Sequence, residues 1–352
     1  MSFPEVADRI SALAAVAADW REPDHPEREA AVTAARAAEN HCTAEAMAFT
    51  INQRMHTLTE EALTAWAAEI PQAATPQSVA LLDGAATPLA TFNVWVALVL
   101  AGHTVQYRPP DAFPSLLPAI ADAVTALLGS RIFSLATAEE KRSCNAVIAK
   151  SILTSQPDTE DIPQLRLGSR TTVAIVENPS DETWEHLAED ALLYDGKGDA
   201  SPRLLFAPAG LEPDGFLEAC AHFRAIYPAH KDTPGRLKMQ QAMLEALDVP
   251  HGYNDDLGFL VSKGEAEIQS PGHIRWVPYA SFTEIGPQLP SDLHLVIAAD
   301  DVAAQTKGVP SEIPLIHPGT AHRPPIEGHT SNDQLVHFLE ALAASGSTAK
   351  NM

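Results

Sequence analysis

Short apolar runs alternate with helical segments from residue 78 onward, and this alternation limits the folds open to the chain. The first runs are SVALL at 78–82, TVQY at 104–107 and RIFSLA at 131–136. Helical stretches separate them, from Pro88 to Ala101 and from about Phe113 to Leu128. Strands that alternate with helices pair in parallel through right-handed crossovers. The chain is therefore predicted to be an α/β protein with parallel sheets.

The second half of the chain repeats this mixture. Further strands are expected at TVAIV, RLLFAP, GFLVS and LHLVIAA, which lie at 172–176, 203–208, 258–262 and 293–299. Thr233 before Pro234 predicts a helix start, with the threonine as the cap. Residues 271–276 are predicted to form a loop with one aromatic anchor. Residues 319–325 are expected to wrap over the fold, because consecutive prolines prevent regular structure.

Length and the first residues complete the outline of the fold. A chain of 352 residues suits two packed lobes rather than one small core. Val6, Ile10, Leu13, Val16 and Trp20 recur at spacings of three and four, which lines one face of a helix. The first 70 residues are therefore expected to be a helical segment.

Charge and composition exclude several classes of partner. The chain has 46 acidic and 23 basic residues and a net charge of −23, which repels nucleic acid and anionic membranes. The longest apolar run, 89–101, is too short to cross a bilayer, so no membrane insertion is expected. Acidic residues stand where a signal peptide needs positive ones, which predicts a cytoplasmic location.

Cysteine and histidine spacing predicts neither a disulfide framework nor a metal site. Cys42, Cys144 and Cys220 are far apart in sequence and are expected to be small buried side chains. Four histidines fall between residues 222 and 273, but none has the spacing of metal ligands.

Two loops could carry chemistry. Residues 83–88 follow the first predicted strand and open a helix, where a phosphate or an oxyanion can meet backbone N–H groups. Residues 195–203, DGKGDASPR, combine two glycines with an acid, a hydroxyl group and two cations. A solvated turn between a helix and a strand explains the second loop equally well.

Several stretches, in order and spacing, resemble the long-chain acyl-CoA reductases of the aldehyde dehydrogenase superfamily, the group that includes the reductase subunit of bacterial luminescence systems. They are INQRMHTLT at 51–59, SVALLDGAATPLATFNVWVALVLAGH at 78–103, SLLPAIADAV at 115–124, SRTTVAIVE at 169–177 and LAEDALLYDGKGDASPRLLFAPAG at 187–210. The resemblance implies an aldehyde dehydrogenase-like two-lobed fold with parallel sheets and a helical N-terminal segment. It assigns 1–70 to that segment, 71–192 to a nucleotide-cofactor-binding lobe, 193–318 to a catalytic lobe, and 319–352 to a C-terminal wrap and helix.

The resemblance also implies a mechanism. In this family a cysteine thiolate attacks the acyl thioester, NADPH delivers a hydride, and aldehyde leaves. An asparagine amide and a backbone N–H hold the oxyanion. At the position of the family's catalytic cysteine this chain has Asp199, and Ser201 matches the end of the family's cysteine motif. At the position of the family's asparagine this chain has Ala86. The positions expected to meet the cofactor hold Arg108, Thr137, Ala138, Glu139 and Glu177.

Two functions follow. The first is NADPH-dependent reduction of a fatty acyl thioester to an aldehyde, with Asp199 and Ser201 lining the reaction centre. The second is a catalytically silent relative that binds an acyl group, a nucleotide or a protein partner. A carboxylate at residue 199 is a weak nucleophile, and its mixed anhydride would be more reactive than the thioester. The superfamily resemblance further suggests a homo-oligomer.

Overall fold

The computed structural model describes residues 3–38, 42–136, 144–151, 162–299, 302, 309–330 and 332–348. The chain gathers into two compact units. The first comprises Met1–Asn40, Met47–Ser169 and Pro325–Met352, and the second comprises His41–Ala46 and Arg170–Pro324. Within the described ranges, every helix is too short or too polar to cross a membrane.

The first unit contains a five-stranded sheet with the order β3-β2-β1-β4-β5, in which every pair is parallel. Its strands are β1 (Ser78–Asp83), β2 (Thr104–Arg108), β3 (Phe133–Leu135), β4 (Ala146–Lys150) and β5 (Gln164–Leu167). Its helices are α1 (Val6–Arg21), α2 (Pro26–Ala37), α3 (Ala44–Thr57), α4 (Glu60–Glu69), α5 (Phe92–Ala101), α6 (Leu116–Leu128) and α11 (Asn332–Thr348), and the start of α3 lies in the second unit.

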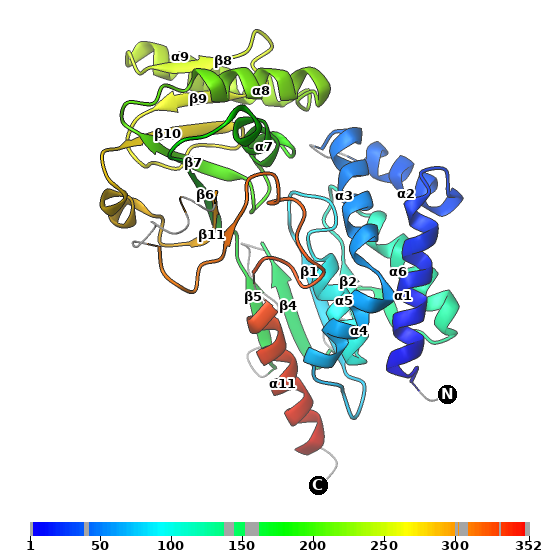
Figure 1. Cartoon of the computed structure of the whole chain (residues 1–352). Coiled ribbons are helices and arrows are strands. Elements are labelled where there is room, and N and C mark those ends of the chain that lie inside the picture. Colours follow the sequence, from blue (N-terminus) through cyan, green and yellow to red (C-terminus); the bar gives the residue numbers. More distant parts are fainter. Residues whose placement is uncertain are drawn as a thin grey trace. The chain divides into compact units, whose positions relative to one another are not determined.

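Two features of the sequence account for the core of this unit. Helix α5 is apolar on nearly every side and almost wholly buried, and it ends at Gly102, whose φ of 90° suits glycine. Helices α1 and α2 pack on α6, and the C-terminal helix α11 lies beside β5 (Figure 1). The Gln77 side chain donates a hydrogen bond to the backbone oxygen of Leu342 at 2.9 Å, which ties α11 to this unit.

The second unit contains a seven-stranded sheet with the order β12-β11-β6-β7-β10-β9-β8 (Figure 1). Only the β8–β9 pair is antiparallel among its described strands. The strands are β6 (Thr171–Ile175), β7 (Pro202–Pro208), β8 (His251–Tyr253), β9 (Leu260–Lys263), β10 (His273–Tyr279), β11 (Leu293–Ala298) and β12 (Leu315–Ile316). The helices are α7 (Asp181–Leu192), α8 (Asp214–Ile226), α9 (Thr233–Ala246) and the short 3-10 turns Phe282–Glu284 and Gly286–Gln288.

An aromatic cluster joins helices to the sheet in this unit. The Trp184 ring of α7 lies with its centroid 5.7 Å from that of Phe216 and 5.8 Å from that of Trp276. All three side chains are buried. Offset aromatic contacts at this separation are favourable beyond the area they bury. They fix α7 and α8 against β10 and so position the loop that follows α7.

The expectation of parallel α/β architecture is confirmed, and one element was predicted wrongly. Residues 271–276 were expected to be a loop, but His273–Tyr279 form β10, which lies between β7 and β9. The sequence HIRWVPY has polar residues that normally avoid a sheet interior. His273 is accommodated because its ring nitrogens lie 2.7 Å from Ser262 Oγ and 2.7 Å from Gln240 Oε1.

Candidate functional site

The loop after α7, which the sequence singled out, is held in a strained turn. Asp195 has φ 52° and Gly196 has φ 69°. A Cβ atom on Gly196 would lie 2.6 Å from the backbone nitrogen of Gly272, just before β10. Only glycine permits both the positive φ and this close approach of two backbones. The loop is therefore locked against the sheet of the second unit.

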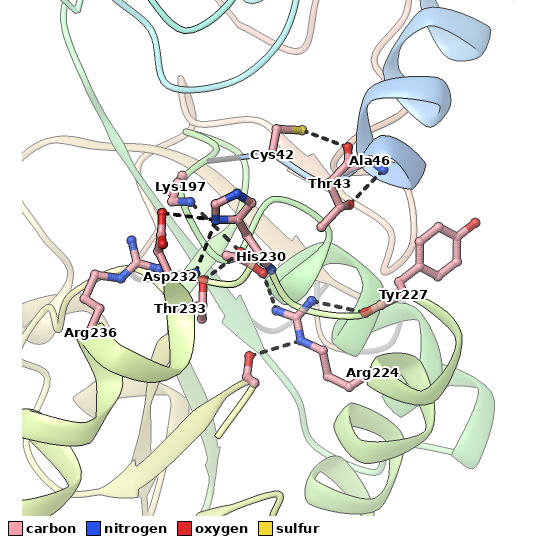
Figure 2. Close-up of polar contacts among 12 residues, drawn as sticks. Cys42, Thr43, Ala46, Lys197, Arg224, Tyr227, His230, Asp232, Thr233 and Arg236 are labelled. Carbon is pink, nitrogen blue, oxygen red and sulfur yellow. Dashed lines mark hydrogen bonds and ion pairs between the residues drawn. The ribbon is translucent and has the colours of Figure 1, made fainter. Parts of the chain in front are cut away.

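The carboxylate of Asp195 is the centre of a buried polar network. Its partners Arg224, His230 and Thr233 are shown in Figure 2. It accepts hydrogen bonds from Arg224 Nη2 at 2.7 Å, Thr233 Oγ1 at 2.8 Å and the backbone N–H of His230 at 3.1 Å. Thr233 was expected to cap α9, but Asp232 occupies the cap position. The threonine hydroxyl donates to Asp195 instead, because a buried carboxylate needs donors.

Basic side chains surround this turn. Lys197 Nζ lies 4.0 Å from the Asp195 carboxylate, and Arg203 donates from Nη1 to the backbone oxygen of Gly196 at 3.2 Å. Burial lowers the pKa of Arg203 to about 10, and the positive charge of Arg236 adds to this effect. Burial also lowers the pKa of Lys197, although Asp195 opposes it. A chain with a net charge of −23 thus concentrates positive charge here.

A thiol that the sequence did not point to belongs to the same unit. Cys42 precedes α3, and its Sγ lies 3.5 Å from the backbone oxygen of Thr43 (Figure 2). Burial raises its pKa to about 12, while the charge of Lys197 acts in the opposite direction. About 150 residues separate Cys42 from the loop, so no local motif could connect the two. The expectation that the cysteines are buried side chains is wrong for Cys42, which is half-buried, and is confirmed for Cys144 and Cys220.

Asp199 and Ser201 both lie on this loop. Asp199 is half-buried, and its backbone oxygen accepts a hydrogen bond from Thr172 Oγ1 at 2.7 Å. Ser201 is buried, with Oγ 3.4 Å from Nε2 of His322. That same Nε2 lies 2.8 Å from the backbone oxygen of Asp190. A carbonyl oxygen only accepts, so Nε2 carries the proton and is not a base for Ser201.

The carboxylate of Asp190 anchors the wrapping segment. It accepts hydrogen bonds from the backbone N–H groups of Gly319 at 2.6 Å and Ala321 at 3.2 Å. Burial raises the pKa of Asp190 to about 7, and the two N–H donors act against that rise. His322 therefore reaches Ser201 from a segment that is fixed to the end of α7.

In the first unit, the loop after β1 has already used some of its backbone donors. The N–H of Gly84 donates to the backbone oxygen of Lys150 at 2.9 Å. The N–H of Ala85 donates to Asp83, whose buried carboxylate also accepts from Thr91 and Tyr107. These bonds remove two N–H groups from any oxyanion or phosphate at this loop.

The remaining predicted residues are distributed over both units. Ala86 and Arg108 are exposed in the first unit, after β1 and at the end of β2. Glu177 is half-buried in the second unit after β6. Burial raises the pKa of Tyr279 to about 12, and the negative charge of Glu177 acts in the same direction. Thr137, Ala138 and Glu139 lie outside the described residues.

The carboxyl ends of the strands in the first unit provide a further candidate. The sheet order changes direction between β1 and β4, and open α/β sheets bind ligands at such a point. Asp83 and Lys150 are register partners at this position. Arg108 ends the neighbouring strand β2. Two cations therefore lie at the carboxyl ends of the interior strands β2 and β4.

Comparisons with known proteins establish the fold. No protein-family model matches the sequence, and no curated protein sequence matches it. An NAD-dependent benzaldehyde dehydrogenase from Corynebacterium glutamicum matches 95% of this chain and 83% of its own, with 12% identity and a TM-score of 0.64. The match to a betaine aldehyde dehydrogenase from Staphylococcus aureus covers 89% of this chain and 75% of that protein, with 11% identity and a TM-score of 0.63. The match to a 1-pyrroline-5-carboxylate dehydrogenase from Thermus with bound NAD covers 89% of this chain and 72% of that protein, with 12% identity and a TM-score of 0.60. The chain has the aldehyde dehydrogenase fold.

Proposed function

We propose that the chain is a catalytically silent relative of the acyl-CoA reductases, which binds a nicotinamide nucleotide and a fatty acyl thioester without forming an acyl-enzyme. The observation that carries the proposal is the side chain at residue 199. It is a carboxylate on the loop where the family resemblance calls for a thiol. Attack by this carboxylate on a thioester is uphill, because the product is an activated anhydride.

The cysteines of the chain support this proposal. Cys220 is completely buried in α8, and burial raises its pKa above the ordinary range. Cys42 has its pKa raised to about 12. Cys144 is buried in the first unit among Ala80, Leu82 and Val147. A buried neutral thiol attacks an ester poorly, since the thiolate is the nucleophile.

Binding of a nucleotide rests on the sheet edge of the first unit. Arg108 offers a planar set of N–H donors that suits a phosphate, and Lys150 adds a second cation. In this proposal Arg108 and Lys150 hold a phosphate group of the nicotinamide nucleotide, which supplies a hydride when bound, and Asp199 and Ser201 line the acyl site in the second unit.

A second candidate is an active NADPH-dependent reductase that converts a fatty acyl thioester to an aldehyde. The positive charge near the Asp195–Gly196 turn favours it, because Lys197, Arg203 and Arg236 would stabilise an oxyanion that develops beside this loop. Such a site would have to work without the thiol and the amide that the family resemblance implies.

Ligand binding and covalent chemistry can be measured on the same sample. The full chain is mixed with NADPH, with a long-chain acyl-CoA, and with both together, and its melting temperature, its intact mass and the NADPH absorbance are recorded. We expect each ligand to raise the melting temperature, with no acyl adduct and no loss of NADPH absorbance. An adduct or NADPH oxidation would establish the second candidate. No thermal shift with either ligand would exclude both candidate functions.

In the variant Arg108→Ala the shift with NADPH should shrink, while the shift with acyl-CoA should persist.

A further inference from the structure

Three cations of the second unit lie close together around the turn at the start of the candidate loop. Lys197 and Arg203 belong to the loop, and Arg236 lies in the first turn of α9. Arg236 Nη2 donates a hydrogen bond to Thr233 Oγ1 at 3.1 Å (Figure 2). Thr233 Oγ1 and Lys197 Nζ lie 2.8 Å and 4.0 Å from Oδ2 of Asp195. Arg203 Nη1 donates at 3.2 Å to the backbone oxygen of the residue before Lys197. We term these three cations the cation cluster.

Among the described residues, few carboxylates balance the cation cluster. Asp195 is the nearest acid to Lys197, but its Oδ1 is already bound by Arg224 at 2.7 Å. Asp232 also acts on Lys197, although its side chain is 54% exposed, so that water screens its charge. Neither Arg203 nor Arg236 forms an ion pair in the part of the chain that the structure describes. In a chain with twice as many acids as bases, this excess of positive charge is an exception.

The two arginines of the cluster also carry donors that the chain does not use. Nε of Arg203 and Nε of Arg236 are buried, and no described residue accepts a hydrogen bond from either. Burial lowers the pKa of Arg203 to about 10, and the charge of Arg236 acts in the same direction. The charge of Arg236 also lowers the pKa of Lys197, after burial itself. Half-buried cations that repel one another are unfavourable alone, and an anion among them turns this repulsion into attraction.

The chemistry of the cation cluster favours a phosphate group over a carboxylate. Each guanidinium offers a planar set of N–H donors, and the ammonium adds a compact charge. A phosphate monoester carries about −1.5 to −2 charges at neutral pH and has three acceptor oxygens, so it can meet three cations at once. A carboxylate carries a single charge and would leave the cluster positive. The start of α9 adds the positive end of its helix dipole.

We propose that the cation cluster binds a phosphate group of a small molecule, with Lys197, Arg203 and Arg236 as its donors. Lys197 precedes Asp199 on the loop and Arg203 follows it, so the phosphate is held beside the proposed acyl site. The group belongs either to a free phosphorylated compound or to coenzyme A, which experiment can separate. The inference does not depend on the proposed function, because the cluster is complete without a nicotinamide nucleotide or an acyl chain.

Titration with inorganic phosphate tests the site. Phosphate is added to the full chain at constant ionic strength, set with sodium chloride, and the melting temperature is recorded. We expect a saturable rise for the wild type. Arg236→Gln should weaken phosphate binding by at least about tenfold, because it removes a charged donor. Lys238→Gln is the matched control, since it removes one charge from an exposed residue of the same helix. It should change the affinity by less than about twofold.

A local measurement is also needed, because phosphate bound at Arg108 in the first unit would raise the melting temperature as well. Amide hydrogen exchange should slow in peptides that cover residues 195–203 and 233–240 when phosphate is added, and Arg108→Ala should leave this protection unchanged. Circular dichroism confirms that each variant is folded. No saturable shift, an equal loss of affinity in Lys238→Gln, or protection confined to the first unit would overturn the proposal.

Coenzyme A distinguishes the two sources of the phosphate group. If one of its phosphates occupies the site, coenzyme A should bind more tightly than inorganic phosphate, and Arg236→Gln should weaken the binding of both. If the site serves a free phosphorylated compound, Arg236→Gln should weaken only inorganic phosphate and leave the affinity for coenzyme A unchanged. Either result supports the phosphate site and identifies its source.

Discussion

Arg224 donates a hydrogen bond from Nη2 to Oδ1 of Asp195 across 2.7 Å, and both side chains are buried. The arginine lies on α8, while the aspartate follows α7. Through Thr233, the same carboxylate also meets the start of α9. One ion pair therefore connects three helices of the second unit around the candidate loop.

Removal of the arginine should be costly. Arg224→Met keeps much of the apolar stem but leaves the buried Asp195 carboxylate with only the more distant Lys197 ammonium, at 4.0 Å, so we expect a loss of about 3–5 kcal/mol in the free energy of unfolding. Urea denaturation measures it. Lys263→Met breaks an exposed pair with Glu212 and should cost less than about 1 kcal/mol. Similar losses in the two variants would mean that the Asp195 network contributes little.

The two-glycine turn allows a test of backbone packing. Gly196→Ala and Gly129→Ala both put a side chain on a residue with positive φ, at 69° and 59°. Around Gly129 no atom lies within 4 Å of the new Cβ, so only the conformational cost of about 1–2 kcal/mol applies. At Gly196 the Cβ also meets the Gly272 backbone. Thermal melts should show a much larger loss for Gly196→Ala, and equal losses would contradict the close approach.

Stability should depend on pH through Asp190. Its pKa is raised to about 7 in the folded chain, so between an ordinary aspartate pKa of about 3.9 and that value only the folded state binds the proton. The contribution of Asp190 to stability therefore falls as pH rises, by roughly 2–3 kcal/mol from about pH 5 to about pH 8. The lowered pKa values of His103 and His273 act in the opposite direction over this range, so the effect is measured as a difference. The free energy of unfolding of the wild type, relative to that of Asp190→Asn, should decrease as pH rises in urea denaturation. Asp255→Asn, at an exposed residue, should behave as the wild type.

Restoring the implied thiol should restore part of the chemistry. Asp199→Cys supplies a thiol, and we expect this variant to form an acyl adduct with a long-chain acyl-CoA. Asp199→Asn, which has no thiol, serves as the control and should form none. Intact mass spectrometry against time measures the adduct. An Asp199→Cys variant that never becomes acylated would contradict the proposal that residue 199 lines the acyl site.

The alternation of apolar runs with helices was sufficient to predict the parallel α/β fold. The same pattern failed to predict strand β10, where polar and apolar side chains are buried together. Strand β10 was predicted as a loop because His273 and Arg275 interrupt its apolar pattern, yet both are buried. The Ser262 and Gln240 groups that accommodate His273 lie 11 and 33 residues away, so only the folded chain reveals them.

Apolar side chains along the helix that begins at Thr233 do not all join the core. Met243 and Leu247 are exposed, while Leu237 and Leu244 are buried. The sequence of a helix does not show which of two apolar faces is covered. The loop at 195–203 was chosen from its own residues alone, whereas Arg224, Thr233 and Cys42, which interact with it, come from distant segments that carry no shared motif.

The order of the two units along the chain has a consequence for biosynthesis. Apart from His41–Ala46, the second unit is one continuous stretch, while the first is completed only by residues after Pro324. On the ribosome, residues 170–324 are complete before α11 is made, and the surface of the first unit that α11 covers stays uncovered until then. During translation Leu335, Leu339 and Leu342 are the last buried side chains to arrive, and until then their docking surface is a natural binding site for a chaperone.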